Sequence, residues 1–494
     1  GLIAGATGTG KTVTLKVMAE SFSDAGVPVF LADVKGDLAG MCRPGEDSAD
    51  MQARIARFGL QEAGFRYRAY PTEFWDIFGK QGLPLRTTVS EFGPLLFARL
   101  LDLNKIQSDL LEIIFRIADE EGLLLLDMKD LKSMVRYVEE NADAYREQYG
   151  NIGKSSTGAI LRALVALEGK GGAQFFGEPA LQISDWMRVD ADGRGYVNIL
   201  DSTSLIQDPT IYSTFMLWML NELFTELPEA GDLEKPKMVF FFDEAHLLFD
   251  GAPKSLLDKI EQVVKLIRSK GVGVYFITQN PADIPGGVLA QLGNKVQHAL
   301  RAYTPAEQKG VKAAADSFRK NPAFDTAEAL QGLKTAEALI SFLDEGGAPA
   351  EVRTASILPP QSKFGALDAI TQQAAILTST LREKYANEID RESAYELLLK
   401  RVDEEAAAAA KAREEAEAEK QAAKEAAAAE REAKKKATQQ KRVVASIGSS
   451  VTGTIGREVG KQLGKSAGGS FGKQLGGNVG ASLGRGLLKT LLKF

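Results

Sequence analysis

The first residues of the chain form a motif whose residue types can bind a phosphate chain. Residues 5–12 match the pattern G-x-x-x-x-G-K-[ST]. Its glycines allow a tight turn in which backbone N–H groups point inward at phosphate oxygens, Lys11 reaches the β- and γ-phosphates, and Thr12 offers its hydroxyl to Mg²⁺. The predicted nucleotide-binding residues are Gly5, Ala6, Thr7, Gly8, Thr9, Gly10, Lys11 and Thr12. The motif therefore predicts a nucleoside triphosphatase, in preference to a Gly/Thr-rich turn that matches by chance.

Two acidic residues supply the second half of such a site. Asp243 and Glu244 directly follow the apolar run 238–242, which is typical of a strand buried on both faces of a parallel sheet. We expect Asp243 to hold Mg²⁺ and Glu244 to orient and deprotonate the attacking water. The alternative is an acidic helix cap after a strand. For His246 a relay role is open, but simple packing beside the strand end is favoured.

Two further polar residues follow strands that come later in the chain. Gln279 ends the apolar run 272–278 and is a candidate sensor of the γ-phosphate and the attacking water; the alternative is a side chain that only terminates the strand. Arg301 follows an expected strand over 295–300 and is the candidate that stabilises γ-phosphate charge in the transition state. The predicted catalytic residues are thus Lys11, Glu244, Gln279 and Arg301, and the predicted metal ligands are Thr12 and Asp243.

Three charged residues carry weaker signals. Lys35 and Asp37 follow an expected strand over 27–32, where they face nucleotide, a neighbouring subunit or only solvent in a Lys-Gly-Asp turn. Arg162 lies on an expected helix and acts on a neighbour's phosphate in one interpretation, but a solvated or ion-paired side chain is favoured.

The elements that must position these residues alternate between strands and helices. Residues 1–4 read as the end of a buried strand and residues 11–22 as a helix, so the glycine-rich loop joins a strand to a helix N-terminus. A helix and then a short strand are expected over 51–70, and a strand over 195–201. Because apolar strands alternate with helices, the pattern predicts an α/β fold with a mainly parallel sheet.

Five segments together resemble a known family. They are GATGTGKT at 5–12, LADVKGDLAG at 31–40, FFFDEAH at 240–246, YFITQNP at 275–281 and NKVQHALRAYTP at 294–305. In this order they resemble the HerA/FtsK-type P-loop ATPases, and most closely the bacterial HerA-like group that includes YjgR. The resemblance covers residues 1 to about 363 and implies a RecA-like core, ATP hydrolysis at subunit interfaces, a homohexameric ring and, for the better understood relatives, translocation along double-stranded DNA.

The chain divides into segments of different composition. We expect an NTPase core in two parts, a helical insertion, a helical segment, an Ala/Glu/Lys-rich helix and a Gly-rich basic tail; these are residues 1–86 and 191–363, 87–190, 364–403, 404–445 and 446–494. The helical segment is expected to run from 366 to 401. The next segment contains a run of strong helix formers without apolar a and d positions, which favours a single exposed spacer helix over a coiled coil.

The composition limits the remaining possibilities. Hydrophobic residues make up 44% and charged residues 26%, as in ordinary globular proteins. A single cysteine, Cys42, fits a reducing compartment, so a cytoplasmic location is expected. No apolar run is long enough to span a bilayer. The sequence begins without Met and inside a strand, so further residues before Gly1 are expected in the full-length protein.

The last segment leaves two functions open. Residues 446–494 carry seven cationic and one anionic side chain, and glycine recurs there at every fourth position from Gly456 to Gly484. This spacing suits close helix packing, yet glycine disfavours an isolated helix, so disorder and a helix induced by an anionic membrane surface or a protein partner are about equally favoured. The first hypothesis is an ATP-driven ring motor on DNA; the second is an ATPase that remodels protein or membrane-associated complexes, tethered by this tail and peripherally membrane-associated.

Overall fold

The computed structural model describes residues 1–231, 233–250 and 254–452. The chain forms two units, Gly1–Val402 and Asp403–Phe494. The strands in the described residues are β1 (Leu2–Ala4), β2 (Val29–Asp33), β3 (Thr72–Asp76), β4 (Leu83–Pro84), β5 (Val197–Asp201), β6 (Met238–Phe242), β7 (Val272–Thr278), β8 (Lys295–His298), β9 (Glu337–Ser341) and β10 (Arg353–Ser356).

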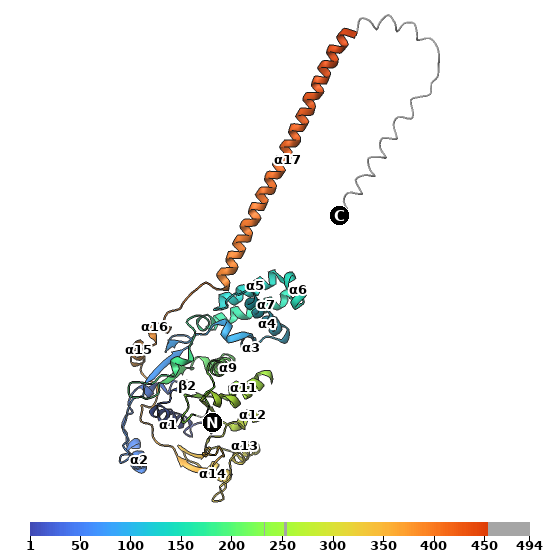
Figure 1. Cartoon of the computed structure of the whole chain (residues 1–494). Helices are drawn as coiled ribbons and strands as arrows, with labels where there is room; N and C mark the ends of the chain where they lie inside the picture. Colours follow the sequence, from blue (N-terminus) through green and yellow to red (C-terminus); the bar gives the residue numbers. More distant parts are fainter. Residues whose placement is uncertain (232, 251–253, 453–494) are drawn as a thin grey trace. The chain divides into compact units, whose positions relative to one another are not determined.

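Helices connect these strands and cover the sheet (Figure 1). The α-helices are α1 (Lys11–Asp24), α2 (Ala49–Arg57), α3 (Val89–Leu100), α4 (Lys105–Glu120), α5 (Met128–Glu140), α6 (Ala142–Tyr149), α7 (Lys154–Gly169), α8 (Gly172–Phe175), α9 (Pro209–Glu226), α10 (His246–Phe249), α11 (Lys254–Leu266), α12 (Gly286–Leu289), α13 (Pro305–Asp316), α14 (Thr326–Gly332), α15 (Ala369–Leu377), α16 (Arg382–Tyr385) and α17 (Ala394–Thr452). Short 3-10 turns are η1 (Ala39–Cys42), η2 (Ile183–Trp186), η3 (Leu205–Gln207), η4 (Ile267–Lys270) and η5 (Pro281–Asp283).

One sheet organises the first unit. Its strand order is β10-β9-β8-β1-β7-β6-β2-β5-β3-β4. Every neighbouring pair from β8 to β4 is parallel, and only the pairs of β9 with β8 and with β10 are antiparallel. The prediction of an α/β fold with a mainly parallel sheet is confirmed. Because β1 lies between β7 and β8, residues that follow these three strands meet at the same edge of the sheet.

The sheet is buried on both faces because its central strands are mainly apolar, and β6 is apolar at every position. Phe240 and Phe242 of β6 pack into one core cluster, and Phe241 packs into a second cluster on the other face. The second cluster also contains Leu15 and Ala19 of α1, so this helix covers that face beneath the phosphate-binding motif. The alternation of adjacent side chains between two cores is what period-two strand geometry requires.

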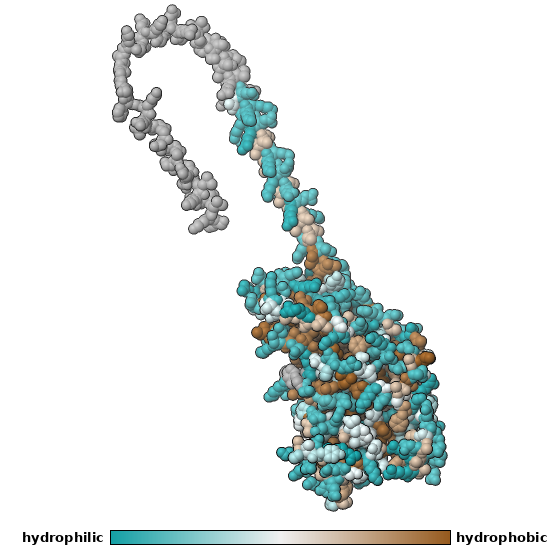
Figure 2. Space-filling model, turned by 180° about the vertical axis from the view of Figure 1, so that it is seen from behind, coloured by the Kyte–Doolittle hydropathy of each residue, from teal (hydrophilic) through white to brown (hydrophobic). Residues whose placement is uncertain are grey.

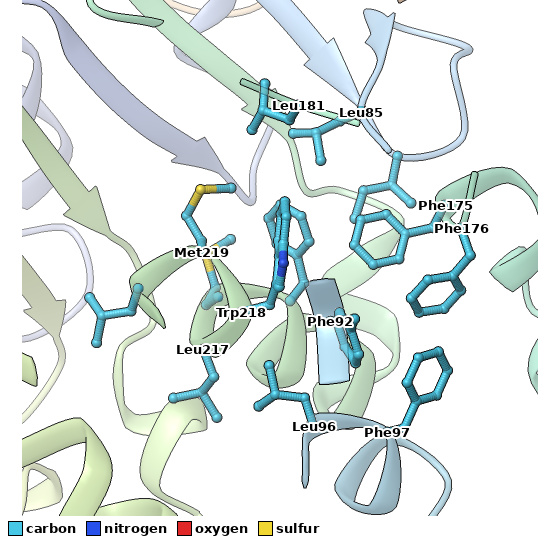
Figure 3. Packing of buried hydrophobic residues seen from close by; sticks show 14 of the residues in the cluster. Leu85, Phe92, Leu96, Phe97, Phe175, Phe176, Leu181, Leu217, Trp218 and Met219 are labelled. Carbon is cyan, nitrogen blue, oxygen red and sulfur yellow. The ribbon is translucent and has the colours of Figure 1, made fainter. Parts of the chain in front are cut away.

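The helical insertion packs against the opposite face through α9. Helices α3, α4, α5 and α7 contact one another, and α3 also contacts α9, which is buried along nearly its whole length (Figure 1). Figure 3 shows the aromatic side chains that join them: Phe92 and Phe97 of α3, Phe175 and Phe176 at α8, and Trp218 of α9. The ring centroids of Phe175 and Trp218 are 5.6 Å apart in an edge-on arrangement.

Two local predictions differ from the structure here. The sequence predicts a short strand within 51–70, but the strand that follows α2 is β3. It begins at Thr72, and its side chains are buried from Glu73 to Asp76. The helix expected over 366–401 is divided into α15, α16 and the first turns of α17. The break is explained by backbone pairing, since Ile389 N–H donates to the carbonyl of Glu178 at 3.0 Å and Ala394 N–H donates to that of Leu124 at 2.9 Å.

Helix α17 continues through the Ala/Glu/Lys-rich segment. Its described side chains from residue 403 to 439 are all exposed, and Figure 2 shows this stretch as mainly hydrophilic. None of the helices in the described residues combines the length and apolar content needed to cross a bilayer. Most of the predicted Gly-rich tail, residues 453–494, lies outside the described residues.

Candidate nucleotide site

The loop at residues 5–12 joins β1 to α1 and is held on two sides. Ala6 N–H donates to the carbonyl of Ala299 at 2.9 Å, and Ala336 N–H donates to the carbonyl of Thr9 at 3.0 Å. Gly5 has φ +150°, and a Cβ there would lie 2.5 Å from the Cβ of His298. Only glycine therefore fits at this position, because any side chain would collide with β8.

Lys11 lies inside this loop. Its Nζ donates to the carbonyl of Gly5 at 2.6 Å and to that of Ala6 at 3.1 Å. Burial lowers the pKa of Lys11, the nearby ammonium of Lys35 lowers it further, and the carboxylates of Asp243 and Glu244 act in the opposite direction. The ammonium is thus already placed in the concavity where the phosphate-binding motif requires it.

The strand β6 delivers its two acids to the same place. The carbonyl of Asp243 accepts a hydrogen bond from the hydroxyl of Tyr212 on α9, and one carboxylate oxygen of Asp243 accepts from Glu244 N–H at 2.9 Å. Burial, with the adjacent Glu244 carboxylate, raises the pKa of Asp243 to about 6, while Lys35 and Lys11 oppose the shift. A buried acid beside a second acid carries charge that a cation would compensate.

Glu244 occupies an unusual backbone conformation. Its φ is +48°, in the left-handed region that few non-glycine residues adopt. Its Oε2 is buried and has no hydrogen-bond partner among the described residues, and Nδ1 of His246 lies 3.4 Å away without forming a hydrogen bond. Strain and an unpartnered carboxylate oxygen are features that cluster at functional sites. The ring of His246 faces the predicted general base, and the choice between a relay role and packing stays a prediction.

Gln279 and Arg301 reach the same edge of the sheet from opposite sides of β1. Strand β7 pairs with β1 so that Thr278 is level with Ala4, which places Gln279 beside the start of the loop. Strand β8 ends at His298, earlier than the expected strand over 295–300, and Arg301 follows it. Both side chains are exposed, and no hydrogen bond or ion pair joins either one to another residue that the structure describes.

The charges of Asp243 and Glu244 act on Lys11, so these three side chains lie near one another. The positions of Gln279 and Arg301 at the same edge of the sheet follow only from the pairing of β7 and β8 with β1. Arg162 is exposed on α7, which packs against α4, α5 and α8 in the helical insertion.

Thr12, in the first turn of α1, and Asp243 supply the hydroxyl and carboxylate oxygens that Mg²⁺ prefers. With phosphate oxygens and water completing such a shell, the donor set fits Mg²⁺.

His298 is a structural residue of the site that the sequence reasoning did not single out. It is fully buried, its Nδ1 lies 3.0 Å from the carbonyl of Glu337, and its Nε2 lies 2.8 Å from the hydroxyl of Thr14 on α1. Because a carbonyl only accepts, Nδ1 carries the proton and Nε2 accepts from Thr14. Strand β8 consists of Lys295, Val296, Gln297 and His298, so its hydrophobic pattern gave no signal that this histidine is buried.

We expect His298 to make stability depend on pH. Burial lowers the pKa of His298 to about 4 from an ordinary 6.5. Between these pH values His298 is therefore protonated in the unfolded chain and neutral in the folded chain. The contribution of His298 to stability should therefore fall as the pH falls from 6.5 toward 4, by about 2 kcal/mol between pH 7 and pH 5. Because the raised pKa values of Asp243 and Glu222 act in the opposite direction, this contribution is read as the difference between the unchanged protein and a variant that lacks the His298 imidazole. Urea unfolding of the unchanged protein and of His298→Gln at both values measures the effect.

The other histidine provides the control for this experiment. The sequence contains two histidines, and His246→Gln, which retains the His298 imidazole, should show the same change in stability between pH 7 and pH 5 as the unchanged protein. His298→Gln should lose about 2 kcal/mol less than the unchanged protein over that interval. An equal loss in all three proteins would show that His298 is not the group responsible.

The comparisons with known proteins agree with this geometry. A strand, a glycine-rich loop and a helix, with two acids after the parallel strand next but one in the sheet, define a P-loop ATPase with a RecA-like core. Residues 1–475 match the family described as Helicase HerA-like C-terminal, and the chain belongs to this family. Membership of the subgroup that includes YjgR stays a prediction.

Curated relatives match over part of the chain. A probable helicase of Methanocaldococcus jannaschii is 32% identical over 139 residues, which cover 26% of this chain and 25% of the relative. The DNA double-strand break repair helicase HerA of Sulfurisphaera tokodaii is 28% identical over 156 residues, covering 31% and 30%. The aligned part thus spans less than a third of the length of either relative.

Several solved structures align with most of the chain at low sequence identity. The bacterial conjugative coupling protein TrwBdeltaN70 aligns with a TM-score of 0.48 and 14% identity, covering 73% of this chain and 85% of that one. VirB4 of Thermoanaerobacter pseudethanolicus aligns with a TM-score of 0.47 and 16% identity, covering 75% and 90%. TrwB has also been solved with ADP and Mg²⁺, at a TM-score of 0.48 and 13% identity over 73% of this chain and 85% of that one.

Proposed function

We propose that the chain binds ATP with Mg²⁺, hydrolyses it, and uses the energy to move along double-stranded DNA as a homohexameric ring. Hydrolysis is supported mainly by the position of the Asp243–Glu244 pair, whose carboxylates interact electrostatically with Lys11 of the P-loop. A site that only binds nucleotide has no need of a strained acid with an unpartnered oxygen beside the phosphates. Family membership and the helicase relatives favour DNA as the polymer.

Each residue has a distinct role in this proposal. The backbone of residues 5–12 and Lys11 hold the phosphates, and Thr12 and Asp243 hold Mg²⁺. The bound ion would neutralise charge that develops on the phosphates. Glu244 orients the attacking water and accepts its proton, and its position beside Asp243 keeps it at the phosphate end of the site. Gln279 and Arg301 respond to the γ-phosphate from the two sides of β1.

The deciding experiment measures ATP turnover of the chain with and without linear duplex DNA. We expect turnover that duplex DNA stimulates, and no turnover in Lys11→Ala, because that change removes the charge nearest the β- and γ-phosphates. Lys11→Ala should also bind ATP much more weakly, as measured with a fluorescent analogue. Light scattering in the presence of nucleotide should report six subunits.

The possible outcomes separate the parts of the proposal. Absence of turnover under all conditions would contradict hydrolysis, and tight ATP binding by Lys11→Ala would contradict the P-loop assignment. Turnover that duplex DNA leaves unchanged would contradict DNA as the polymer and favour the remodelling of protein or membrane-associated complexes. The role of residues 446–494 in that second function stays a prediction, since most of the segment lies outside the described residues.

A further inference from the structure

The loop after β2 lies next to the acids of the nucleotide site. Strand β2 pairs in parallel with β6, and Leu31 is level with Phe241. Asp33, the last residue of β2, is therefore level with Asp243, and the turn that follows lies beside the Asp243–Glu244 pair. The sequence could not decide whether Lys35 in this turn faces nucleotide, a neighbouring subunit or solvent. The pairing of β2 with β6 places this turn beside the acids of the site.

A buried carboxylate fixes the conformation of this turn. Asp33 is 3% exposed, and its two carboxylate oxygens accept hydrogen bonds from four successive backbone N–H groups. The donor–acceptor distances are 3.3, 2.7, 3.1 and 2.9 Å for residues 35 to 38 in order. Gly36 has φ +71°, which a tight turn of this kind favours. Lys35 is thus carried on a rigid backbone even though its side chain is exposed.

The ammonium of Lys35 acts on both halves of the nucleotide site. The turn that carries Lys35 adjoins the Asp243–Glu244 pair through the pairing of β2 with β6, and its charge interacts with those of Lys11 and Asp243. No hydrogen bond or ion pair joins the Lys35 side chain to another residue in the described part of the chain. Lys11 and Lys35 repel each other because both side chains carry a positive charge, and a phosphate chain bound between them would compensate this repulsion.

We propose that Lys35 is a further catalytic residue, whose ammonium binds an oxygen of the γ-phosphate of ATP in its own subunit. This inference rests on the proposed ATP hydrolysis. In the reaction, a water oxygen attacks the γ-phosphorus and gives its proton to Glu244. The bond from the γ-phosphorus to the β–γ bridging oxygen breaks, and its electron pair leaves with ADP. Lys35 stabilises the charge on the equatorial γ-oxygens while Lys11 serves the β- and γ-phosphates.

The test removes the charge and keeps the length of the side chain. Lys35→Met should lower kcat by about 10²- to 10³-fold, the loss typical when one donor to a developing charge is removed. Its affinity for a non-hydrolysable ATP analogue should fall about tenfold, while its affinity for ADP should stay within about twofold, because ADP lacks the γ-phosphate. Lys35→Arg should recover part of the turnover, since it restores the positive charge.

The matched control is Lys309→Met, which removes another exposed lysine, on α13. Its turnover, nucleotide affinities and unfolding temperature should all equal those of the unchanged protein. The unfolding temperature of Lys35→Met should also be unchanged, because the exposed ammonium takes no part in the hydrogen bonds that hold the turn. Equal loss of ADP and ATP-analogue affinity with a lower unfolding temperature would show a structural role and overturn the proposal.

Two further outcomes distinguish this inference from the function on which it rests. If the unchanged protein hydrolyses ATP and Lys35→Met does so at the same rate, Lys35 is not catalytic although the proposed function stands. If the unchanged protein fails to hydrolyse ATP, both proposals fail together. Mixing Lys35→Met with Lys11→Ala subunits should restore no turnover, and restoration would place Lys35 in the site of a neighbouring subunit and overturn its assignment to its own.

Discussion

Replacement of Glu244 by Gln is expected to leave ATP binding intact and to lower turnover by at least about a hundredfold. The amide has nearly the same size as the carboxylate, so the phosphate-binding loop should keep its shape. It cannot accept the proton of the attacking water, and general-base contributions run from about 10² to 10⁴ in rate. A steady-state ATPase assay together with the affinity for a fluorescent ATP analogue measures both parts.

The structure gives two reasons to expect this large effect at Glu244 in particular. Its Oε2 is buried without a partner among the described residues, so the carboxylate keeps an oxygen available for water. Its backbone at φ +48° is held in a costly conformation, which a purely structural acid would not require. Glu62→Gln, at an exposed glutamate, is the control and should keep normal turnover. Near-normal turnover in Glu244→Gln would remove this residue from the mechanism.

The elements of the nucleotide site that lie close together in the sequence were predictable from it. The glycine-rich loop is bounded by its own strand and helix, so its conformation depends on residues within one short segment. The acids after β6 were predictable for a related reason, because an apolar run of that kind predicts a buried parallel strand and its carboxyl end must lie at the ligand-binding edge. Strand β7 pairs with β1, and this pairing places Gln279 at the same edge of the sheet.

Other features depend on contacts between residues far apart in the chain. His298 and Thr14 are separated by 284 positions, and only the pairing of β8 with β1 brings them together. Lys35 reaches the site through the pairing of β2 with β6, which involves strands more than 200 residues apart. The strand β3 was missed because its first residues, Thr72 and Glu73, are polar, and the hydrophobic pattern alone gives such a strand little signal.

His246 shows a second limit of sequence reasoning. Packing was the favoured interpretation, since a histidine after a strand usually packs. The structure turns its Nδ1 toward Glu244 at 3.4 Å, because a short helix, α10, begins at His246, two residues after the strained residue. The direction of that ring depends on the unusual backbone of Glu244, and no pattern in the sequence predicts a positive φ for a glutamate.

Replacement of Arg301 by Ala is expected to leave ATP affinity within a few-fold and to lower turnover by about 10³. The arginine is exposed, and no contact within the described part of the chain occupies its guanidinium. It follows β8, which pairs with the P-loop strand, so it lies at the edge where a γ-phosphate would be bound. Arginines that stabilise charge on a transferring phosphoryl group contribute 10³ or more in rate and little to ground-state binding.

Mixing experiments then decide in which subunit Arg301 acts. If it reaches the site of a neighbouring subunit in a ring, Arg301→Ala subunits mixed with Lys11→Ala subunits should recover some turnover, because some interfaces then contain an intact P-loop and an intact arginine. Recovery should be absent if Arg301 serves its own subunit. Arg353→Ala, at an exposed arginine on β10, is the control and should keep full turnover. Full turnover in Arg301→Ala itself would exclude Arg301 from catalysis, and the charge on the γ-phosphate would then depend on the two lysines, Lys11 and Lys35.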